Sequence, residues 1–193
     1  MSKDAFQLSG SAASIYEEQK VPAMFGPLAD ATLAVVPLRE DDQVIDVACG
    51  TGIVARKVRQ KLGPKARVVG VDLNEGMIAK ASISDESARE CEWVVADVTK
   101  LPFDDQSFTI AFCQQGIQFF PDASAALGEM RRVLQPNGRV AITVWAGPSD
   151  FFVALADSLS KHINEEVAKQ SLAPFSFGDI KKLFTSMEGA GFQ

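Results

Sequence analysis

The feature that most constrains this chain is the stretch Val44–Gly52, in which a β-branched run stops at a glycine-rich turn. The residues from Ile53 onward favour a helix, so the stretch predicts a strand, a tight turn and a helix N-terminus. Gly50 and Gly52 can adopt positive φ angles, and neither has a Cβ that would keep a ligand from the backbone. Such a turn brings backbone N–H groups close to a bound molecule, so we expect a ligand site here.

The turn by itself fits two kinds of ligand. Gly50-x-Gly52-x-x-Ala55 matches the dinucleotide fingerprint, and Asp72 follows at about the distance of a ribose-binding acid. Asp46, however, would lie on the floor of the site, where its charge repels a pyrophosphate and attracts an ammonium or a sulfonium group. This pattern favours S-adenosylmethionine over a nicotinamide dinucleotide. A carboxylate that only bonds to nearby backbone is the structural alternative for Asp46.

Length and composition predict a single domain over residues 1–193. The chain is 47% hydrophobic and 23% charged, and no apolar run approaches the roughly 20 residues that cross a bilayer. The net charge of −6 argues against a nucleic-acid surface, and Met1–Gln7 lacks the apolar core of an export signal. We therefore expect a cytoplasmic protein that spans no membrane, binds no nucleic acid and acts on a small molecule.

Cysteine and histidine usage argues against a metal site. Cys49, Cys91 and Cys113 each lie in or beside an expected buried strand, and the sequence has no Cys-x-x-Cys pair. They are typical of reduced core residues and not of a disulfide framework. His162 is the only histidine, and a lone histidine on a helix is more often a surface or packing residue than a base.

Apolar runs predict four more strands along the chain. Such nearly continuous runs are typical of parallel strands buried on both faces, and helical patterns between them complete right-handed β-α-β units. The sequence therefore predicts an α/β domain. The strands are expected over Arg67–Asp72, Glu92–Ala96, Ser107–Cys113 and Arg139–Trp145.

Two of the expected helices can be described in more detail. In the helix over residues 53–62, the apolar positions face inward, and Arg56 and Arg59 are placed on the solvated side. A later helix starts at Asp122 and is stopped by Pro136-Asn137-Gly138, before the last strand.

Acidic residues close three successive expected strands, at Asp46, Asp72 and Asp97. Ligands of open α/β sheets collect at the carboxyl ends of the strands. Asp72 could accept hydrogen bonds from both ribose hydroxyls, with Leu73 against the adenine face, and Asp97 could accept one from the adenine amino group. One such acid is ordinary, whereas the repetition is specific. For Asp72, a cap of the following helix is the structural alternative.

Polar amides follow the fourth expected strand, at Gln114, Gln115 and Gln118. They suit a site that hydrogen-bonds neutral substrate groups beside a transferred methyl group. The alternative is a turn in which Phe119 and its neighbour cap the core.

Two helical segments flank the expected sheet. The N-terminal segment, residues 1–36, would comprise a loose arm over residues 1–11, a short helix, a break at Val21-Pro22 and a longer helix. It carries Tyr16, the only tyrosine, which lies over the end of the first strand or is a surface residue. The other segment, residues 148–175, is expected to be a helical lid, with Phe152 over the ligand.

Five stretches, in this order and spacing, resemble the class I S-adenosylmethionine-dependent methyltransferases, in particular their UbiE-like small-molecule branch. The resemblance covers about residues 12–145 and implies a Rossmann-like, doubly wound, mostly parallel sheet with strand order 3-2-1-4-5. The stretches are Val44–Gly52, Val69–Met77, Ala96–Phe103, Phe112–Asp122 and Met130–Val140.

The resemblance implies S-adenosylmethionine as the cofactor and S-adenosylhomocysteine as the product. It assigns the methionine moiety to one acid and the glycine turn, and the nucleoside to the acids of the next two strands. The implied contacts are Asp46, Ala48, Cys49, Gly50, Thr51 and Gly52 for the methionine moiety, Asp72 for the ribose, Leu73, Met77, Asp97 and Val98 for the adenine, Gln114 for the sulfonium side and Tyr16 for the carboxylate. The acceptor is expected to meet Gln115, Gln118, Phe119 and Phe152.

The chain departs from the family pattern at two points. Ala48 stands where the family's turn has its first glycine. Relatives also continue past a Gly-Phe like Gly191-Phe192 into sixth and seventh strands, which are absent here. The expected sheet thus ends in an open edge at its fifth strand, and an unpaired edge invites association. We expect that edge to be covered by the lid or by a second copy, which would make a homodimer.

The implied reaction is an in-line displacement that moves a methyl group to an oxygen or carbon of a small phenol-, quinol- or natural-product-like acceptor. The sequence assigns no catalytic residue. Two alternatives stay open: a non-catalytic domain that binds S-adenosylmethionine or a partner, and a nicotinamide-dependent oxidoreductase. Asp46 and the lack of a Tyr-Lys or His pair disfavour the oxidoreductase.

Overall fold

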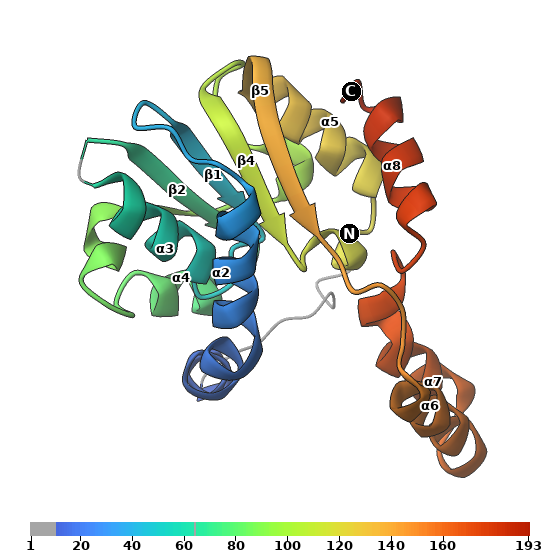
Figure 1. Cartoon of the computed structure of the whole chain (residues 1–193). Helices are drawn as coiled ribbons and strands as arrows, with labels where there is room; N and C mark the ends of the chain where they lie inside the picture. Colours follow the sequence, from blue (N-terminus) through green and yellow to red (C-terminus); the bar gives the residue numbers. More distant parts are fainter. Residues whose placement is uncertain (1–10, 64) are drawn as a thin grey trace.

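The computed structural model describes residues 11–63 and 65–193, which form a parallel sheet between two layers of helices (Figure 1). The loose arm predicted over residues 1–11 lies, apart from Ser11, outside the described residues. The strands of the described part are β1 (Gln43–Val47), β2 (Arg67–Asp72), β3 (Glu92–Val95), β4 (Phe108–Gln114) and β5 (Leu134–Thr143).

The strand order within the described residues is β3-β2-β1-β4-β5, and every pairing is parallel. This confirms the predicted Rossmann-like sheet. The chain moves outward from β1 to β3 and then returns beside β1 as β4, so the topological switch point lies between β1 and β4. Ligands of such sheets bind at this point, outside the carboxyl ends of the strands.

Helices cover both faces of the sheet (Figure 1). On one face, α2 (Gly26–Val35) and α3 (Ile53–Leu62) bury Ala29 and Val58 against β1, β2 and β4. On the other, α5 (Ala123–Val133) and α8 (Ile180–Gly189) bury side chains such as Leu127. Strands enclosed on both sides need the continuous apolar runs that the sequence provides. The shorter helices are α4 (Glu75–Ala81), η2 (Ser87–Glu90), η3 (Val98–Lys100), η4 (Ile117–Phe119) and η5 (Ala173–Phe175).

The N-terminal helical segment runs without the predicted break. It consists of α1 (Ser11–Ile15), the π-helix η1 (Tyr16–Phe25) and then α2, with Pro22 inside η1. The Gly26 N–H donates to the Val21 carbonyl, five residues back. The wider π-helical turn spares the proline ring the clash that it would make in a regular α-helix.

β5 begins earlier than predicted. Leu134 already pairs with Phe108, and the next pairing joins Arg139 to Ile110. The residues between, in which Asn137 has a φ of 63°, form a bulge inside the strand. The Pro-Asn-Gly signal was therefore interpreted wrongly: it marks an irregularity of β5, while α5 ends at Val133.

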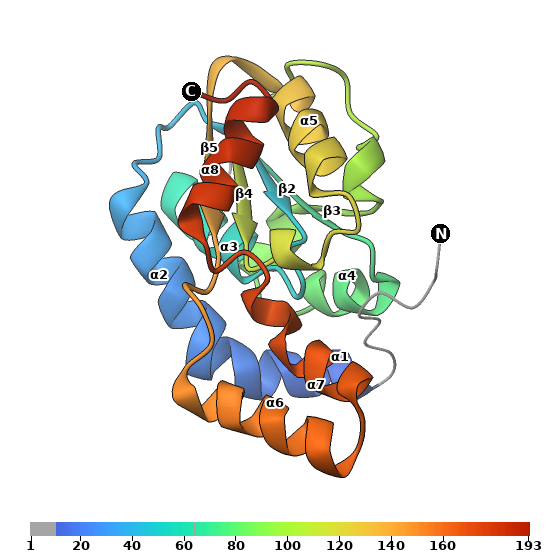
Figure 2. The ribbon, with the colours of Figure 1, turned by 90° about the vertical axis from the view of Figure 1, so that its right-hand side faces the viewer.

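The segment predicted as a lid forms two helices, α6 (Asp150–His162) and α7 (Glu165–Leu172), with the Asn164 side chain capping the second. Both views place this pair and α1 beyond the carboxyl ends of the strands (Figures 1 and 2). No helix within residues 11–63 and 65–193 is long and apolar enough to cross a membrane.

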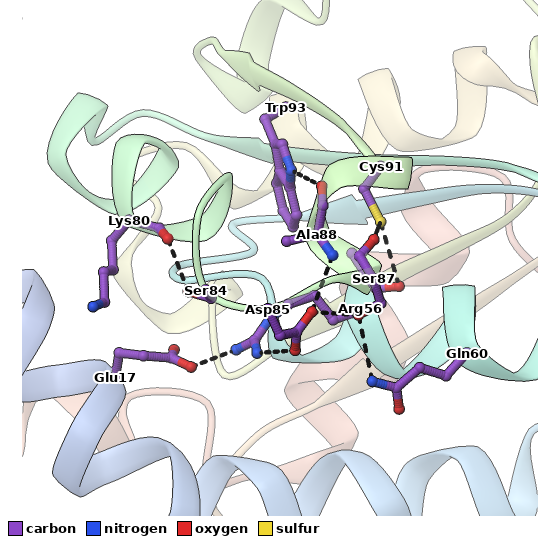
Figure 3. Close-up of polar contacts among 11 residues, drawn as sticks. Glu17, Arg56, Gln60, Lys80, Ser84, Asp85, Ser87, Ala88, Cys91 and Trp93 are labelled. Carbon is purple, nitrogen blue, oxygen red and sulfur yellow. Dashed lines mark hydrogen bonds and ion pairs between the residues drawn. The ribbon is translucent and has the colours of Figure 1, made fainter.

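The prediction that Arg56 and Arg59 lie on the solvated side of α3 is wrong. They are 5% and 3% exposed. The Arg59 guanidinium donates to the carbonyls of Gly63 and Ala66 at the end of its own helix and in the following loop. Arg56 meets two carboxylates, Glu17 and Asp85 (Figure 3). Buried cations of this kind are tolerated because they are paired.

Candidate functional site

A cavity of about 1230 Å³ opens at the carboxyl ends of the strands. Its walls come from the ends of β1, β2 and β4, the N-terminal helical segment, η3, η4 and the base of the α6–α7 pair. Pockets for one drug-sized ligand usually measure about 300–1,000 Å³, so this cavity is larger than a typical site for a single ligand. Every residue predicted to contact cofactor or acceptor lines it, apart from Gly52: Tyr16, Asp46, Ala48, Cys49, Gly50, Thr51, Asp72, Leu73, Met77, Asp97, Val98, Gln114, Gln115, Gln118, Phe119 and Phe152.

The glycine turn is held in shape by bonds to β2. Ala48, Gly50 and Gly52 have φ angles of 55°, 56° and 83°. The Gly50 N–H donates to Asp72 Oδ2 at 2.8 Å, and the Cys49 N–H donates to the Val71 carbonyl at 3.0 Å. The carboxylate at the end of β2 therefore fixes the turn that follows β1.

Gly52 has a different role from the predicted one. A Cβ on Gly52 would lie 2.1 Å from Cη2 of Trp93, so the missing side chain makes room for an indole ring and not for a ligand. A Cβ on Gly70, in β2, would lie 2.4 Å from Cζ3 of the same ring. A Cβ on Gly50 would come within 3.9 Å of the Tyr16 ring, on the cavity side.

Asp46 is 1% exposed, and its Oδ2 accepts a hydrogen bond from the Ala55 N–H at 3.1 Å, in the first turn of α3. Burial, with a smaller contribution from the charge of Asp72, raises the pKa of Asp46 to about 7. Asp46 thus makes the bond to nearby backbone that the structural alternative expects, and it also lines the cavity. A cation beside it would draw it into the charged form.

Asp72 accepts from two backbone groups, the N–H of Gly50 and that of Asn74, each at 2.8 Å. Burial raises its pKa above the ordinary value in spite of these bonds. The helix that follows is capped by Asn74, whose Oδ1 accepts from the Met77 N–H. The alternative that Asp72 is the helix cap is therefore wrong.

The end of the cavity beyond β2 combines a flat apolar surface with a fixed carboxylate. Leu73 is 53% exposed toward the opening, whereas Met77 is buried. Oδ1 of Asp97 accepts from both the N–H and the hydroxyl of Thr99, at 2.8 and 2.7 Å, in the first turn of η3. Val98 follows in the same turn, so that a ring in this place has apolar contact on its face and polar groups at its edge.

Tyr16 lies in the cavity wall, so the surface alternative is wrong. Its ring stacks on Phe25, with centroids 5.2 Å apart and an interplanar angle of 20°. Burial and the nearby charge of Asp72 raise the pKa of Tyr16 far above its ordinary value. The phenol is therefore a hydrogen-bond donor at every physiological pH.

The amides after β4 form two separate contacts. Gln114 Nε2 donates to the Phe25 carbonyl at 3.1 Å, which ties β4 to η1. Gln118 Nε2 donates to Gln115 Oε1 at 3.1 Å, and Gln115 has a φ of 57°. Within the described part of the chain, three buried oxygens of the cavity lining have no hydrogen-bond partner: Thr51 Oγ1, Gln114 Oε1 and Gln118 Oε1. Buried polar atoms are normally paired, so each of these oxygens lacks its usual donor, although it has almost no accessible surface in the cavity.

Sequence reasoning missed several apolar residues of the cavity. Met24 and Phe25 were assigned no contact with cofactor or acceptor, but they line the cavity from the π-helix η1. The spacing of the sequence gave no signal of a π-helix here. Trp145 and Phe175 also line the cavity. His162, in contrast, is exposed on α6, in keeping with its interpretation as a surface residue.

Comparisons with known proteins agree with this geometry. Residues 45–142 match the family described as "Methyltransferase domain". Demethylmenaquinone methyltransferase of Staphylococcus aureus is 29% identical over 167 residues, which cover 80% of this chain and 69% of that protein.

Solved structures show the same fold. An S-adenosylmethionine-dependent methyltransferase from Aquifex aeolicus has a TM-score of 0.71 at 19% identity, with 94% of this chain and 88% of that chain covered. A methyltransferase in complex with the Haloferax volcanii Trm112 methyltransferase activator has a TM-score of 0.69 at 22% identity, with 94% and 74% covered. The family match selects S-adenosylmethionine from the two ligands that the glycine turn allows. The chain therefore belongs to the methyltransferase-domain family, as a class I S-adenosylmethionine-dependent methyltransferase.

Proposed function

We propose that this chain transfers the methyl group of S-adenosylmethionine to a small, largely apolar acceptor with a phenol- or quinol-like hydroxyl or an activated carbon. The observation that carries the proposal is the two-part lining of one cavity. The strand-ending acids and the glycine turn line one part, and aromatic side chains with amides line the other. A cavity larger than a typical single-ligand site suits a donor and an acceptor held side by side.

The residues present fit the cofactor. Asp46 lies where a ligand cation would keep its carboxylate charged, and the same lining contains the unpartnered oxygens Thr51 Oγ1 and Gln114 Oε1. Asp72 would hold the ribose, Asp97 and Val98 the adenine edge, with Leu73 and Met77 around the ring. Tyr16 would donate to the cofactor carboxylate.

The acceptor part of the cavity has few charges. Met24, Phe25, Phe119, Phe152 and Phe175 make it apolar, which excludes water from the reacting atoms. When bound, the cofactor supplies a methyl group activated by the sulfonium charge. Gln118, held by Gln115, would accept a hydrogen bond from an acceptor hydroxyl and so orient its oxygen. We assign no base, because an acidic phenol or an activated carbon acid can give its proton to bulk water or buffer before the cavity encloses it.

The relative from Staphylococcus aureus, described as a demethylmenaquinone methyltransferase, makes a quinone-like acceptor the first class to test. The first experiment is calorimetric titration with S-adenosylmethionine, S-adenosylhomocysteine and NADH. We expect one-site binding of the first two and none of NADH. Turnover is then measured with S-adenosylmethionine and a panel of phenols and naphthoquinols.

Asp72→Ala is the test variant, and Asp30→Ala, which removes an exposed carboxylate on α2, is its control. Loss of charged hydrogen bonds should weaken cofactor binding roughly 10- to 100-fold in the first variant only. A folded wild-type protein that binds neither S-adenosyl compound would overturn the proposal. Binding of the cofactor without turnover of any phenol or naphthoquinol would overturn the proposed acceptor class and leave the cofactor assignment in place.

A further inference from the structure

A partly buried polar network joins the side chains of Glu17, Arg56, Asp85 and Trp93, and of these side chains the Trp93 ring borders the glycine turn (Figure 3). At its centre is Arg56 of α3, whose side chain is 6% exposed. One terminal nitrogen donates to Glu17 Oε1 and the other to Asp85 Oδ2, both at 2.6 Å. Glu17 belongs to η1 and directly follows Tyr16. The cost of removing a guanidinium from water can cancel the favourable energy of its ion pairs. Stability alone therefore does not explain why Arg56 is buried.

In one direction the network reaches the turn itself. Asp85 Oδ1 accepts from the Ser87 hydroxyl and the Ala88 N–H, at 2.5 and 3.0 Å. The Ala88 carbonyl accepts from the Trp93 indole N–H at 2.8 Å. The Trp93 ring fills the space beside Gly52. A continuous series of contacts therefore joins Arg56 to Trp93 (Figure 3), whose ring borders the glycine turn at Gly52.

In the other direction the network fixes one end of η1. Arg56 holds Glu17 at the start of this helix, and Gln114 holds the Phe25 carbonyl at its end. Tyr16, next to the first attachment, stacks on Phe25, whose carbonyl is the second. Lys20 and Met24, on the same helix, line the cavity. The wall that η1 contributes is thus attached to the sheet domain at two points, one of which is an ion pair with α3.

We propose that Arg56 is a positioning residue for cofactor binding: through Glu17 it holds η1 against the glycine turn, so that Tyr16 faces the cofactor. This proposal rests on the proposed function. Lys57, the next residue of α3, also contacts the N-terminal segment, through Asp30 at 2.7 Å. That pair is more exposed, with side-chain exposures of 23% and 62%, and screened pairs of this kind add little. Lys57→Met is therefore the matched control.

The first test needs no ligand. Trypsin cleavage after Lys20, an exposed residue of η1, is followed by mass spectrometry in the wild type, Glu17→Gln, Arg56→Gln, Arg56→Lys and Lys57→Met. We expect faster cleavage in Glu17→Gln and Arg56→Gln, partial protection in Arg56→Lys and the wild-type rate in Lys57→Met. Unchanged cleavage in Glu17→Gln would overturn the proposal, and this conservative variant keeps the test valid if Arg56→Gln does not fold.

The second test separates positioning from general stability. If η1 is in place for only about a tenth of the time, the apparent Kd for S-adenosylhomocysteine rises about tenfold. We expect this rise in Arg56→Gln, with partial rescue in Arg56→Lys. In a Tyr16→Ala background the same substitution should add less than about twofold, because the side chain through which it acts is gone.

Additive effects of Arg56→Gln and Tyr16→Ala, or an unchanged Kd in Arg56→Gln, would contradict a positioning role. A wild-type protein that binds no S-adenosyl compound would instead refute the proposed function, and the proteolysis result would still decide whether Arg56 holds η1. The two failures are therefore distinguishable.

Discussion

At the scale of single residues, Ala48 and Gly116 form a complementary pair. Ala48 replaces the first glycine of the family turn and adopts the left-handed φ of 55°, which costs a residue with a Cβ about 1 kcal/mol. Its methyl group points at the end of β4, where a Cβ on Gly116 would lie only 2.6 Å from it. The departure at Ala48 is thus accommodated by the absence of a side chain at Gly116, in the connection between β4 and η4.

We predict that Gly116→Ala lowers the free energy of unfolding by about 1–3 kcal/mol, because the added methyl overpacks against Ala48. The double variant with Ala48→Gly should recover part of the loss. Recovery stays incomplete because Cys113 Sγ would still lie 3.0 Å from the new Cβ. Urea unfolding of the wild type, both single variants and the double variant measures these differences. A double variant no more stable than Gly116→Ala would refute the pairing.

Asp46 should make both stability and binding depend on pH. Its pKa in the folded state, about 7, is above the value of the unfolded chain, so its stabilising effect is complete below about pH 4 and is lost as the pH rises to 7. We predict that Asp46→Asn is more stable than the wild type at pH 8 and gains nothing at pH 4. Thermal unfolding at both pH values measures this.

Binding of S-adenosylmethionine near pH 6.5 should release a proton from Asp46, because the ligand's ammonium favours the carboxylate. Calorimetry in two buffers of different ionisation enthalpy detects this release. In Asp46→Asn the binding heat should no longer depend on the buffer. A buffer-independent heat in the wild type would contradict the raised pKa.

At the scale of elements, the sequence predicted best what is determined locally. β2 and α3 have the predicted bounds, because each is a short apolar pattern ended by a turn signal. The start of β5 could not be predicted, because Leu134 belongs to the strand through its pairing with Phe108, which is distant in the sequence. The burial of Arg56 could not be predicted either, because its partners Glu17 and Asp85 are 39 and 29 residues away along the chain.

The site was predictable to the extent that it follows from topology. Asp46, Asp72 and Asp97 meet at one cavity because the ends of parallel strands share an edge of the sheet. The roles of Gly52 and Phe25 depend on which side chain packs beside them, which the sequence pattern does not contain.

The α6–α7 pair reaches the cavity through Phe152, whose ring lies 4.9 Å from that of Phe175. We predict that Phe152→Ala raises the KM for a naphthoquinol acceptor roughly tenfold and leaves the Kd for S-adenosylmethionine within about twofold, because the lost contact belongs to the acceptor side. Phe184→Ala, at a side chain 58% exposed on α8, is the control. Equal effects on acceptor and cofactor would argue against a lid that covers the acceptor.

At the scale of the whole molecule, the two ends of the sheet have separate tasks. The carboxyl ends of the strands surround the cavity, whereas the amino ends are joined by Asp42. This residue is 1% exposed and accepts from Thr109 Oγ1 at 2.7 Å and from Arg139 at 2.6 and 2.8 Å. It thereby links the start of β1 to β4 and to β5. The predicted pairing of a second copy along β5, which lies at an edge of the sheet, stays a prediction for sedimentation analysis.

We predict that Asp42→Ala lowers the free energy of unfolding by about 3 kcal/mol, because it removes the carboxylate that pairs with Arg139. Cofactor affinity should be unchanged, because this pair lies far from the cavity. Although burial alone would raise the pKa of Asp42, hydrogen bonds from Thr109 and Arg139 lower it below its ordinary value. Its contribution is thus present above pH 4 and lost as the pH falls below that. Urea unfolding at pH 7 and pH 3, with calorimetry of the cofactor, measures both parts. A changed Kd in the folded variant would contradict the separation.

Trp93 decides in which order the glycines at and beside the glycine turn can be substituted. One indole ring fills the space beside both Gly52 and Gly70, so neither position can gain a side chain while the ring is there. A lineage that first exchanges Trp93 for a smaller residue leaves only Cys49 Sγ, 3.1 Å from an added Cβ, against Gly70, whereas one that changes Gly70 first expels the ring and loses its bond to Ala88. Gly52 stays glycine on both routes, because its φ of 83° excludes most other residues. Two glycines that look alike in a sequence are thus fixed for different reasons, and only one of them can be released by a change elsewhere.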